Sequence, residues 1–262
     1  MAETIAPGEV WLVGAGPGDP ELLTRKAERL IGAASIVFYD ALVGPGILDL
    51  IPSRVRRVPV GKRSGRHSKD QATIDALLVE AARNGERVVR LKGGDPSMFG
   101  RSMEEADALK AAKIPVHICP GITAASAAAA SAGISLSLRG QVRRVQFVTA
   151  HMQRNGSPGL DWEKLADAGC TTAFYMGGAA ATEISRCLIA AGMRPSTPVL
   201  IACNVSLLDE RMLHTRLDLL PLAARAMADG SPMLILVGEA VAHGCQHPAQ
   251  QSATARQGVA LR

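Results

Sequence analysis

Short apolar runs alternate with amphipathic segments along the chain, and this alternation predicts an α/β fold. Residues 71–84, for example, carry apolar side chains at helical spacing and end in Asn84-Gly85, a typical helix stop. Because helices separate the runs of the first half, we expect a mostly parallel sheet there. Its strands are expected at 10–13, 36–39, 55–60, 88–91 and 116–119.

The second half predicts a sheet of mixed direction. About eight residues separate the expected strands 198–202 and 211–215, which is too few for a helical crossover, so these two should be antiparallel. The other strands of this half are expected at 145–149, 171–176 and 233–237.

The chain is long enough for two modest domains, and the segment 134–142 reads as a hinge between them. This interpretation gives an N-terminal domain at 9–136 and a C-terminal domain at 141–242. Residues 243–262 lose the apolar periodicity and are expected to form a disordered tail. The small-residue helix expected at 124–132 could lie close to neighbouring backbone or to a ligand.

The segment 87–101 takes an apolar strand directly into a glycine pair and a carboxylate. Gly93 and Gly94 remove side chains where a ligand or another backbone could approach closely. Asp95 can cap a helix that begins near Phe99, or it can hydrogen-bond a ligand hydroxyl or amine. A plain strand-to-helix turn explains the glycines equally well, so the residues alone leave both interpretations open.

A second glycine-rich loop, Gly14–Pro20, follows the first strand and resembles the phosphate loop of a dinucleotide-binding fold. However, Asp19 replaces the third glycine and would repel a pyrophosphate, and Pro17 removes one amide donor. A nicotinamide dehydrogenase is therefore disfavoured. Asp40, at the end of the next strand, remains a candidate for chemistry because open α/β sheets gather their sites along that edge.

The net charge of +5 is unevenly distributed. A run of cations without an acid could attract an anion; it consists of Arg54, Arg56, Arg57, Lys62, Arg63, Arg66 and Lys69. Aromatic residues make up 3% of the chain and no nucleic-acid motif is visible, so a multiply carboxylated or phosphorylated small molecule is favoured over nucleic acid. The alternatives are a solvated basic face and, for Lys62, a surface cation instead of a proton donor or carboxylate ligand.

The five cysteines are scattered and odd in number, which predicts reduced thiols. No apolar run reaches the roughly 18 residues of a membrane span, and residues 1–9 lack the features of a secretory signal. We therefore expect a cytoplasmic protein that does not associate with a membrane. His243, Cys245 and His247 form a weak metal pattern, and no metal is expected.

Six motifs occur in order between residues 9 and 241: Gly14–Pro20, Tyr39-Asp40, Val60–Arg63 with His67-Ser68, Val88–Arg101, Pro120–Ala124 and Tyr175–Gly177. Together they resemble the uroporphyrinogen-III C-methyltransferases of the tetrapyrrole methylase family. The resemblance implies transfer of methyl groups from S-adenosylmethionine to C-2 and C-7 of uroporphyrinogen III, giving precorrin-2 for sirohaem, cobalamin or haem d1. It also implies a homodimer of two α/β domains with the site in the cleft between them.

The same resemblance implies roles for individual residues. Asp40 and Lys62 match a proton acceptor and a proton donor, although both could simply orient substrate carboxylates and pyrrole N–H groups. Arg101 is the third catalytic candidate, and together with Glu104 and Arg139 it matches positions that hold the substrate. The positions corresponding to cofactor contacts are Pro17, Gly93, Gly94, Asp95, Met98, Thr123, Ala124, Met176 and Val205.

The chain departs from the family pattern on the expected tetrapyrrole side. Ser102 and Met103 stand where relatives have two glycines, and Leu138 and Gly140 stand where relatives have a histidine and an aspartate. These changes leave open a relative that methylates a different precorrin or a single carbon, or a protein that only holds a tetrapyrrole.

Overall fold

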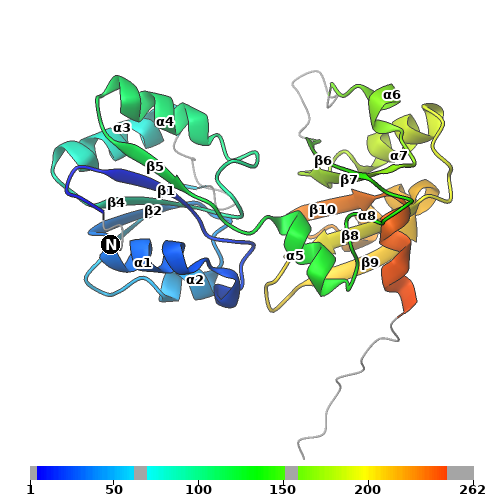
Figure 1. Ribbon diagram of the computed structural model, residues 1–262, viewed down its shortest axis with the longest axis horizontal. Helices are drawn as coiled ribbons and strands as arrows, with labels where there is room; N and C mark the ends of the chain where they lie inside the picture. The colour runs from blue at the N-terminus through cyan, green and yellow to red at the C-terminus, as the bar shows by residue number, and fades with distance from the viewer. Residues whose placement is uncertain (1–4, 62–69, 151–158, 247–262) are drawn as a thin grey trace, which may run out of the picture.

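The computed structural model describes residues 5–61, 70–150 and 159–246, which form two five-stranded sheets in sequence (Figure 1). The first sheet is parallel throughout, with strand order β3-β2-β4-β1-β5. Its strands are β1 (Val10–Gly14), β2 (Ile36–Tyr39), β3 (Arg56–Pro59), β4 (Val88–Lys92) and β5 (Val116–Cys119). The strands expected in the first half are thus confirmed, as is their parallel direction.

Helices cover both faces of this sheet, as a buried parallel sheet requires (Figure 1). Alternation along β1 sends Trp11 and Val13 into the core on the α1 side, and Val10 and Leu12 into the core on the α3 side. The helical elements are η1 (Pro20–Leu22), α1 (Arg25–Ala33), α2 (Pro45–Asp49), α3 (Gln71–Arg83) and α4 (Ser102–Ala111).

The second sheet has the order β6-β7-β10-β8-β9 and is mixed. β6 and β7 are parallel and the other neighbours are antiparallel, including the expected β8–β9 pair. The strands are β6 (Arg144–Thr149), β7 (Cys170–Tyr175), β8 (Pro198–Cys203), β9 (Arg211–Arg216) and β10 (Met233–Val237). The helical elements that follow β6 are α6 (Trp162–Leu165), α7 (Ala181–Ala190), η2 (Leu217–Leu219), α8 (Leu220–Met227) and η3 (Glu239–Gln246).

Helix α5 (Ala124–Ser131) connects the two sheets. It falls in the range expected for the N-terminal domain, yet its buried alanines pack in one cluster with Ala173, Leu200 and Leu236 of the second sheet. At the other end of the chain, η3 continues to Gln246, four residues beyond the expected domain end at 242. Every helix in the described part of the chain is too short or too polar to cross a membrane.

Candidate functional site

The loops that follow β1, β4 and β5 meet at the carboxyl edge of the first sheet with no side chain between them. Gly94 N–H donates to the Gly16 carbonyl at 2.7 Å, and Gly16 N–H donates to the Gly94 carbonyl at 3.1 Å. A Cβ on Gly121 would lie 2.3 Å from the Gly94 oxygen and 2.9 Å from the Gly14 Cα, so a side chain there would force backbone apart. On the other side, no described atom lies within 4 Å of a Cβ built on Gly94, which leaves that side of the loop accessible to a ligand.

Asp95 fixes the shape of this loop. Its Oδ2 accepts from Gly121 N–H at 2.8 Å, and its Oδ1 accepts from the backbone N–H of Ser97 at 2.7 Å and from the Ser97 hydroxyl. Of the two roles considered for Asp95, the helix cap is therefore wrong: α4 begins at Ser102, after Arg101 in a left-handed conformation (φ 55°) and without a side-chain cap. Asp95 instead ties the β4 loop to the β5 loop across 26 residues of sequence.

The start of α5 is held by its own N-cap and by a tyrosine of the second sheet. Thr123 caps it, accepting from Ser126 N–H at 3.2 Å. The phenol oxygen of Tyr175, at the end of β7, accepts from Ala125 N–H at 3.2 Å, and the Tyr175 ring lies 5.2 Å from that of Phe99. Burial raises the pKa of the Tyr175 phenol, so the group stays protonated at neutral pH.

Two further predicted cofactor positions lie beside these contacts. Met176 follows Tyr175, has a left-handed backbone (φ 56°) and is half exposed. Val205 is buried in the cluster that contains Tyr175 and the alanines of α5. Gly94, Asp95, Thr123 and Val205 thus belong to contacts that converge on the start of α5, and Ala124 and Met176 are sequence neighbours of residues in those contacts.

Two of the three predicted catalytic positions, Asp40 and Arg101, lie near the same edge. Asp40 follows β2; its Oδ1 accepts from Leu42 N–H at 3.0 Å, and its Oδ2 lies 3.7 Å from Nη1 of Arg90. Lys62 lies outside the described residues. Arg101 binds Glu104 through two hydrogen bonds of 2.8 and 2.6 Å, and both side chains are more than half exposed.

The Arg101–Glu104 pair has defined charges. The hydrogen bonds raise the pKa of Arg101 and lower that of Glu104, so the two side chains present a guanidinium and a carboxylate together. Arg139 is exposed in the connection between α5 and β6. Within the described residues it forms no hydrogen bond or ion pair with the other predicted positions.

The expected basic patch is not a single surface facing this edge. Arg54 donates to the Gly32 carbonyl at 2.7 Å, Arg57 donates to the Ile51 carbonyl, and Arg56 pairs with Glu86 just before β4. These contacts lie at the amino edge of the sheet, opposite the glycine loops, because the strands are parallel. The remaining members of the run, from Lys62 to Lys69, lie outside the described residues.

A buried ionic cluster behind Asp40 was missed by sequence reasoning. Arg90, Lys92 and Glu105 are each less than 5% exposed, and Glu105 accepts from Arg90 Nε at 3.0 Å and from Lys92 Nζ at 2.7 Å. Burial, reinforced by the neighbouring Arg90, lowers the pKa of Lys92, and Glu105 opposes that shift. The available signal was two cations spaced two residues apart on a strand expected to be buried.

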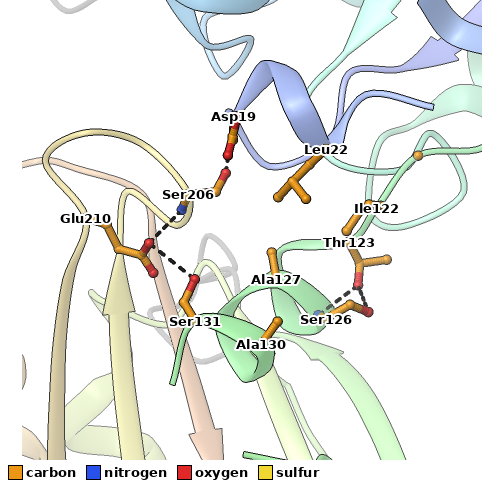
Figure 2. A pocket seen from close by; sticks show the side chains of 11 residues that line it. Asp19, Leu22, Ile122, Thr123, Ser126, Ala127, Ala130, Ser131, Ser206 and Glu210 are labelled. Carbon is orange, nitrogen blue, oxygen red and sulfur yellow. Dashed lines mark hydrogen bonds between the residues drawn. The ribbon is translucent and has the colours of Figure 1, made fainter. Parts of the chain in front are cut away.

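A cavity of about 760 Å³ adjoins the start of α5, between η1 and the loop after β8 (Figure 2). Its size is that of a small-molecule site. Ser206 joins its walls, since its hydroxyl accepts from Asp19 N–H at 3.0 Å while its own N–H donates to Glu210 at 3.2 Å. Thr123 is the predicted cofactor position that lines this cavity, so the cavity borders the site from the η1 side.

The two substitutions at the start of α4 differ in orientation. Ser102 is buried and donates its hydroxyl to the Pro96 carbonyl, so it reinforces the loop. Met103 is 57% exposed. Of the two, Met103 is the side chain available to a substrate.

Known proteins resemble this chain in sequence and in fold. A siroheme synthase of Gluconacetobacter diazotrophicus is 47% identical over 247 residues, which cover 94% of this chain and 53% of the relative. A uroporphyrinogen-III C-methyltransferase of Paracoccus denitrificans is 46% identical over 92% of this chain and 85% of its own length. The structure of the Thermus thermophilus uroporphyrin-III C-methyltransferase complexed with S-adenyl homocysteine superposes with a TM-score of 0.76 at 37% identity, covering 90% of this chain and 99% of that one.

The match extends over most of the chain. The chain spans about half the length of the siroheme synthases it matches. The family model of the tetrapyrrole (corrin/porphyrin) methylases matches residues 9–221, and the chain therefore belongs to this family.

Proposed function

We propose that this chain transfers methyl groups from S-adenosylmethionine to C-2 and C-7 of uroporphyrinogen III, giving precorrin-2. The main support is the convergence of the three glycine loops with the start of α5 and with Tyr175-Met176. This arrangement offers backbone groups and apolar surface, and S-adenosylmethionine has no phosphate that Asp19 would repel. The names of the relatives, one of them crystallised with the demethylated donor, support the same activity.

The chemistry asks mainly for alignment. A pyrrole carbon of the substrate forms a bond to the methyl group, the sulfonium C–S bond breaks, and the macrocycle loses a proton to a base. Asp40 is the proposed base, with Lys62 as the proposed donor. Arg101 is a guanidinium at any pH near neutral, and the hydrogen bond that it donates to Glu104 raises its pKa further, so we assign Arg101 and Arg139 to the substrate carboxylates, with Glu104 orienting Arg101.

The test is an incubation of the purified chain with uroporphyrinogen III and S-adenosylmethionine, followed by mass analysis of the tetrapyrrole. A gain of two methyl groups is expected. No gain would contradict the proposal.

A second candidate is methylation of one carbon, or of a different precorrin, and Met103 is the observation that favours it. A product with one added methyl group would support this alternative. Comparing the product ratio of the wild type with that of Met103→Gly then shows whether this side chain limits the second transfer.

We also propose that the chain works as a cytoplasmic homodimer. Light scattering on the purified protein should give twice the chain mass of 27.4 kDa. A mass of one chain at working concentration would contradict this.

A further inference from the structure

The two consecutive glutamates in the first turn of α4 serve opposite sides of the helix. Glu104 is half exposed and holds Arg101, whereas Glu105 is 1% exposed and faces β4. There it accepts from Arg90 Nε and from Lys92 Nζ, which lie on one face of β4 because they are two residues apart. The first turn of α4 is thereby fixed to the strand that leads into Gly93-Gly94.

Arg90 carries the cluster on to Asp40. The register pairs Arg90 with Phe38, and Asp40 follows two residues later on the same face. Nε of Arg90 binds Glu105, while Nη1 donates to the Leu91 carbonyl at 2.8 Å and lies 3.7 Å from Asp40 Oδ2. The guanidinium therefore joins a fully buried carboxylate to a partly exposed one.

Stability alone does not account for this arrangement. Removing charges from water is costly, and well-packed apolar side chains of similar volume often replace buried ion pairs without loss. The neighbouring positions of the same face, Val10, Leu12 and Phe38, are apolar and fully buried. The ionic cluster occurs at the end of the face, next to Asp40, where a fixed charge can act on a carboxylate.

We propose that Arg90, held in place by Glu105, is a positioning residue that fixes the Asp40 carboxylate for the proton step of methyl transfer. This role rests on the proposed function of the site. The backbone N–H of Leu42 donates to Oδ1 of Asp40, and the Arg90 guanidinium places a positive charge beside Oδ2. Lys92 completes the balance of two cations and two anions in the cluster.

The first test compares Arg90→Met with Leu109→Ala. Leu109 lies one helical turn after Glu105 on α4 and is fully buried, but it carries no charge, so it controls for loss of packing on the same helix. Arg90→Met should lower kcat by about 10- to 100-fold, with S-adenosylhomocysteine affinity within threefold, and Arg90→Lys should recover part of the loss. A kcat for Arg90→Met as high as that of Leu109→Ala at a similar melting temperature would overturn the proposal.

A double-mutant cycle with Asp40→Asn extends the test, and one of its comparisons, the double variant against Asp40→Asn alone, remains available if Arg90→Met by itself does not fold. The double variant Arg90→Met/Asp40→Asn removes one cation and one anion together, which keeps the cluster balanced. If Arg90 acts through Asp40, the double variant turns over no more slowly than Asp40→Asn alone. A further loss of turnover in the double variant, beyond that of Asp40→Asn alone, would show that Arg90 acts elsewhere and would overturn the proposal.

Failure of the inference can be separated from failure of the proposed function. If the wild type transfers no methyl group to uroporphyrinogen III, the proposed function is wrong and the cycle is not measurable. If the wild type is active and the cycle is additive, the function stands and the positioning role is wrong.

Discussion

The two sheets bury different kinds of polar side chain beneath one site. Every buried charged side chain that the structure describes belongs to the first half: Arg90, Lys92, Asp95 and Glu105. In the described part of the second half the buried polar side chains are neutral, such as Ser185, which donates to the Leu217 carbonyl at 2.6 Å. Under the proposed function, the first sheet supplies the charges for the reaction, while the second sheet adds a neutral platform to the glycine loops that hold the methyl donor.

Arg101→Ala is the sharpest test of this division. Arg101→Ala should abolish turnover because a substrate carboxylate loses the guanidinium that binds it. The affinity for S-adenosylhomocysteine should stay within about tenfold of the wild type, or roughly 1.4 kcal/mol. Calorimetric titration and a turnover assay check the two effects separately.

Arg216→Ala is the matched control for Arg101→Ala, since Arg216 makes a similar two-bond contact with Asp218 in the second half. Its turnover should be unchanged. Loss of both turnover and donor affinity in Arg101→Ala would mean that Arg101 shapes the donor loop, and the division would fail.

Gly121→Ala tests the junction of the two halves. The added methyl group would collide with the Gly94 carbonyl, so we expect a loss of about 1–3 kcal/mol in the free energy of unfolding and weaker donor binding. Gly32→Ala, in α1 with open space around it, is the control and should stabilise by roughly 0.5–1 kcal/mol. If denaturant unfolding gave equal changes in the free energy of unfolding for the two substitutions, the backbone around Gly121 would be able to move apart and accept the methyl group.

Tyr175→Phe tests whether the second sheet contributes only to binding of the methyl donor and not to the chemical step. The Ala125 N–H loses its acceptor, which costs about 1–2 kcal/mol, while the ring contact with Phe99 remains. Donor affinity should fall, and kcat at saturating donor should change little. A fall in kcat greater than the fall in affinity would give the second sheet a part in the chemistry.

The smallest expected effect is a pH dependence of stability that arises in the second sheet. Partial burial lowers the pKa of His214 from 6.5, so the unfolded chain takes up this proton first as the pH falls. Stability should therefore be complete above about pH 6.5 and decline slightly below it. In His214→Gln this part of the decline should disappear from melting curves recorded across that range, and an unchanged decline would assign it to other groups.

Periodicity was sufficient to predict the strands of the fold, although α7 and α8 were not predicted. The strands were located because apolar runs bounded by glycine and proline leave few alternatives, and the β8–β9 pair followed from the length of its connection. Local sequence could not predict the partners of Asp95, because Gly121 lies 26 residues away and a helix cap explains the same residue. Similarly, Arg54, Arg56 and Arg57 read as one basic surface until the direction of β3 placed them at the opposite edge.

The parts of the candidate site that are built from backbone loops could be predicted from the sequence. The parts that depend on contacts between side chains of different elements could not. The glycine loops could be recognised directly in the sequence. The link from Glu105 through Arg90 to Asp40 could not, because it depends on the register of β2 and β4 and on where α4 packs against the sheet. The packing of α5 on the second sheet was equally hidden, since a run of alanines carries no preference for either half.

The connection at Pro120 also defines a place where the gene could be recombined. Every strand pairing of the described residues lies wholly before or wholly after this point. A chimaera joined here would have to match only the contacts that cross the junction, chiefly those of Gly121, Tyr175 and Ser206. The half before Pro120, with the buried charges, and the half after it, with the second sheet, could then be exchanged independently between relatives.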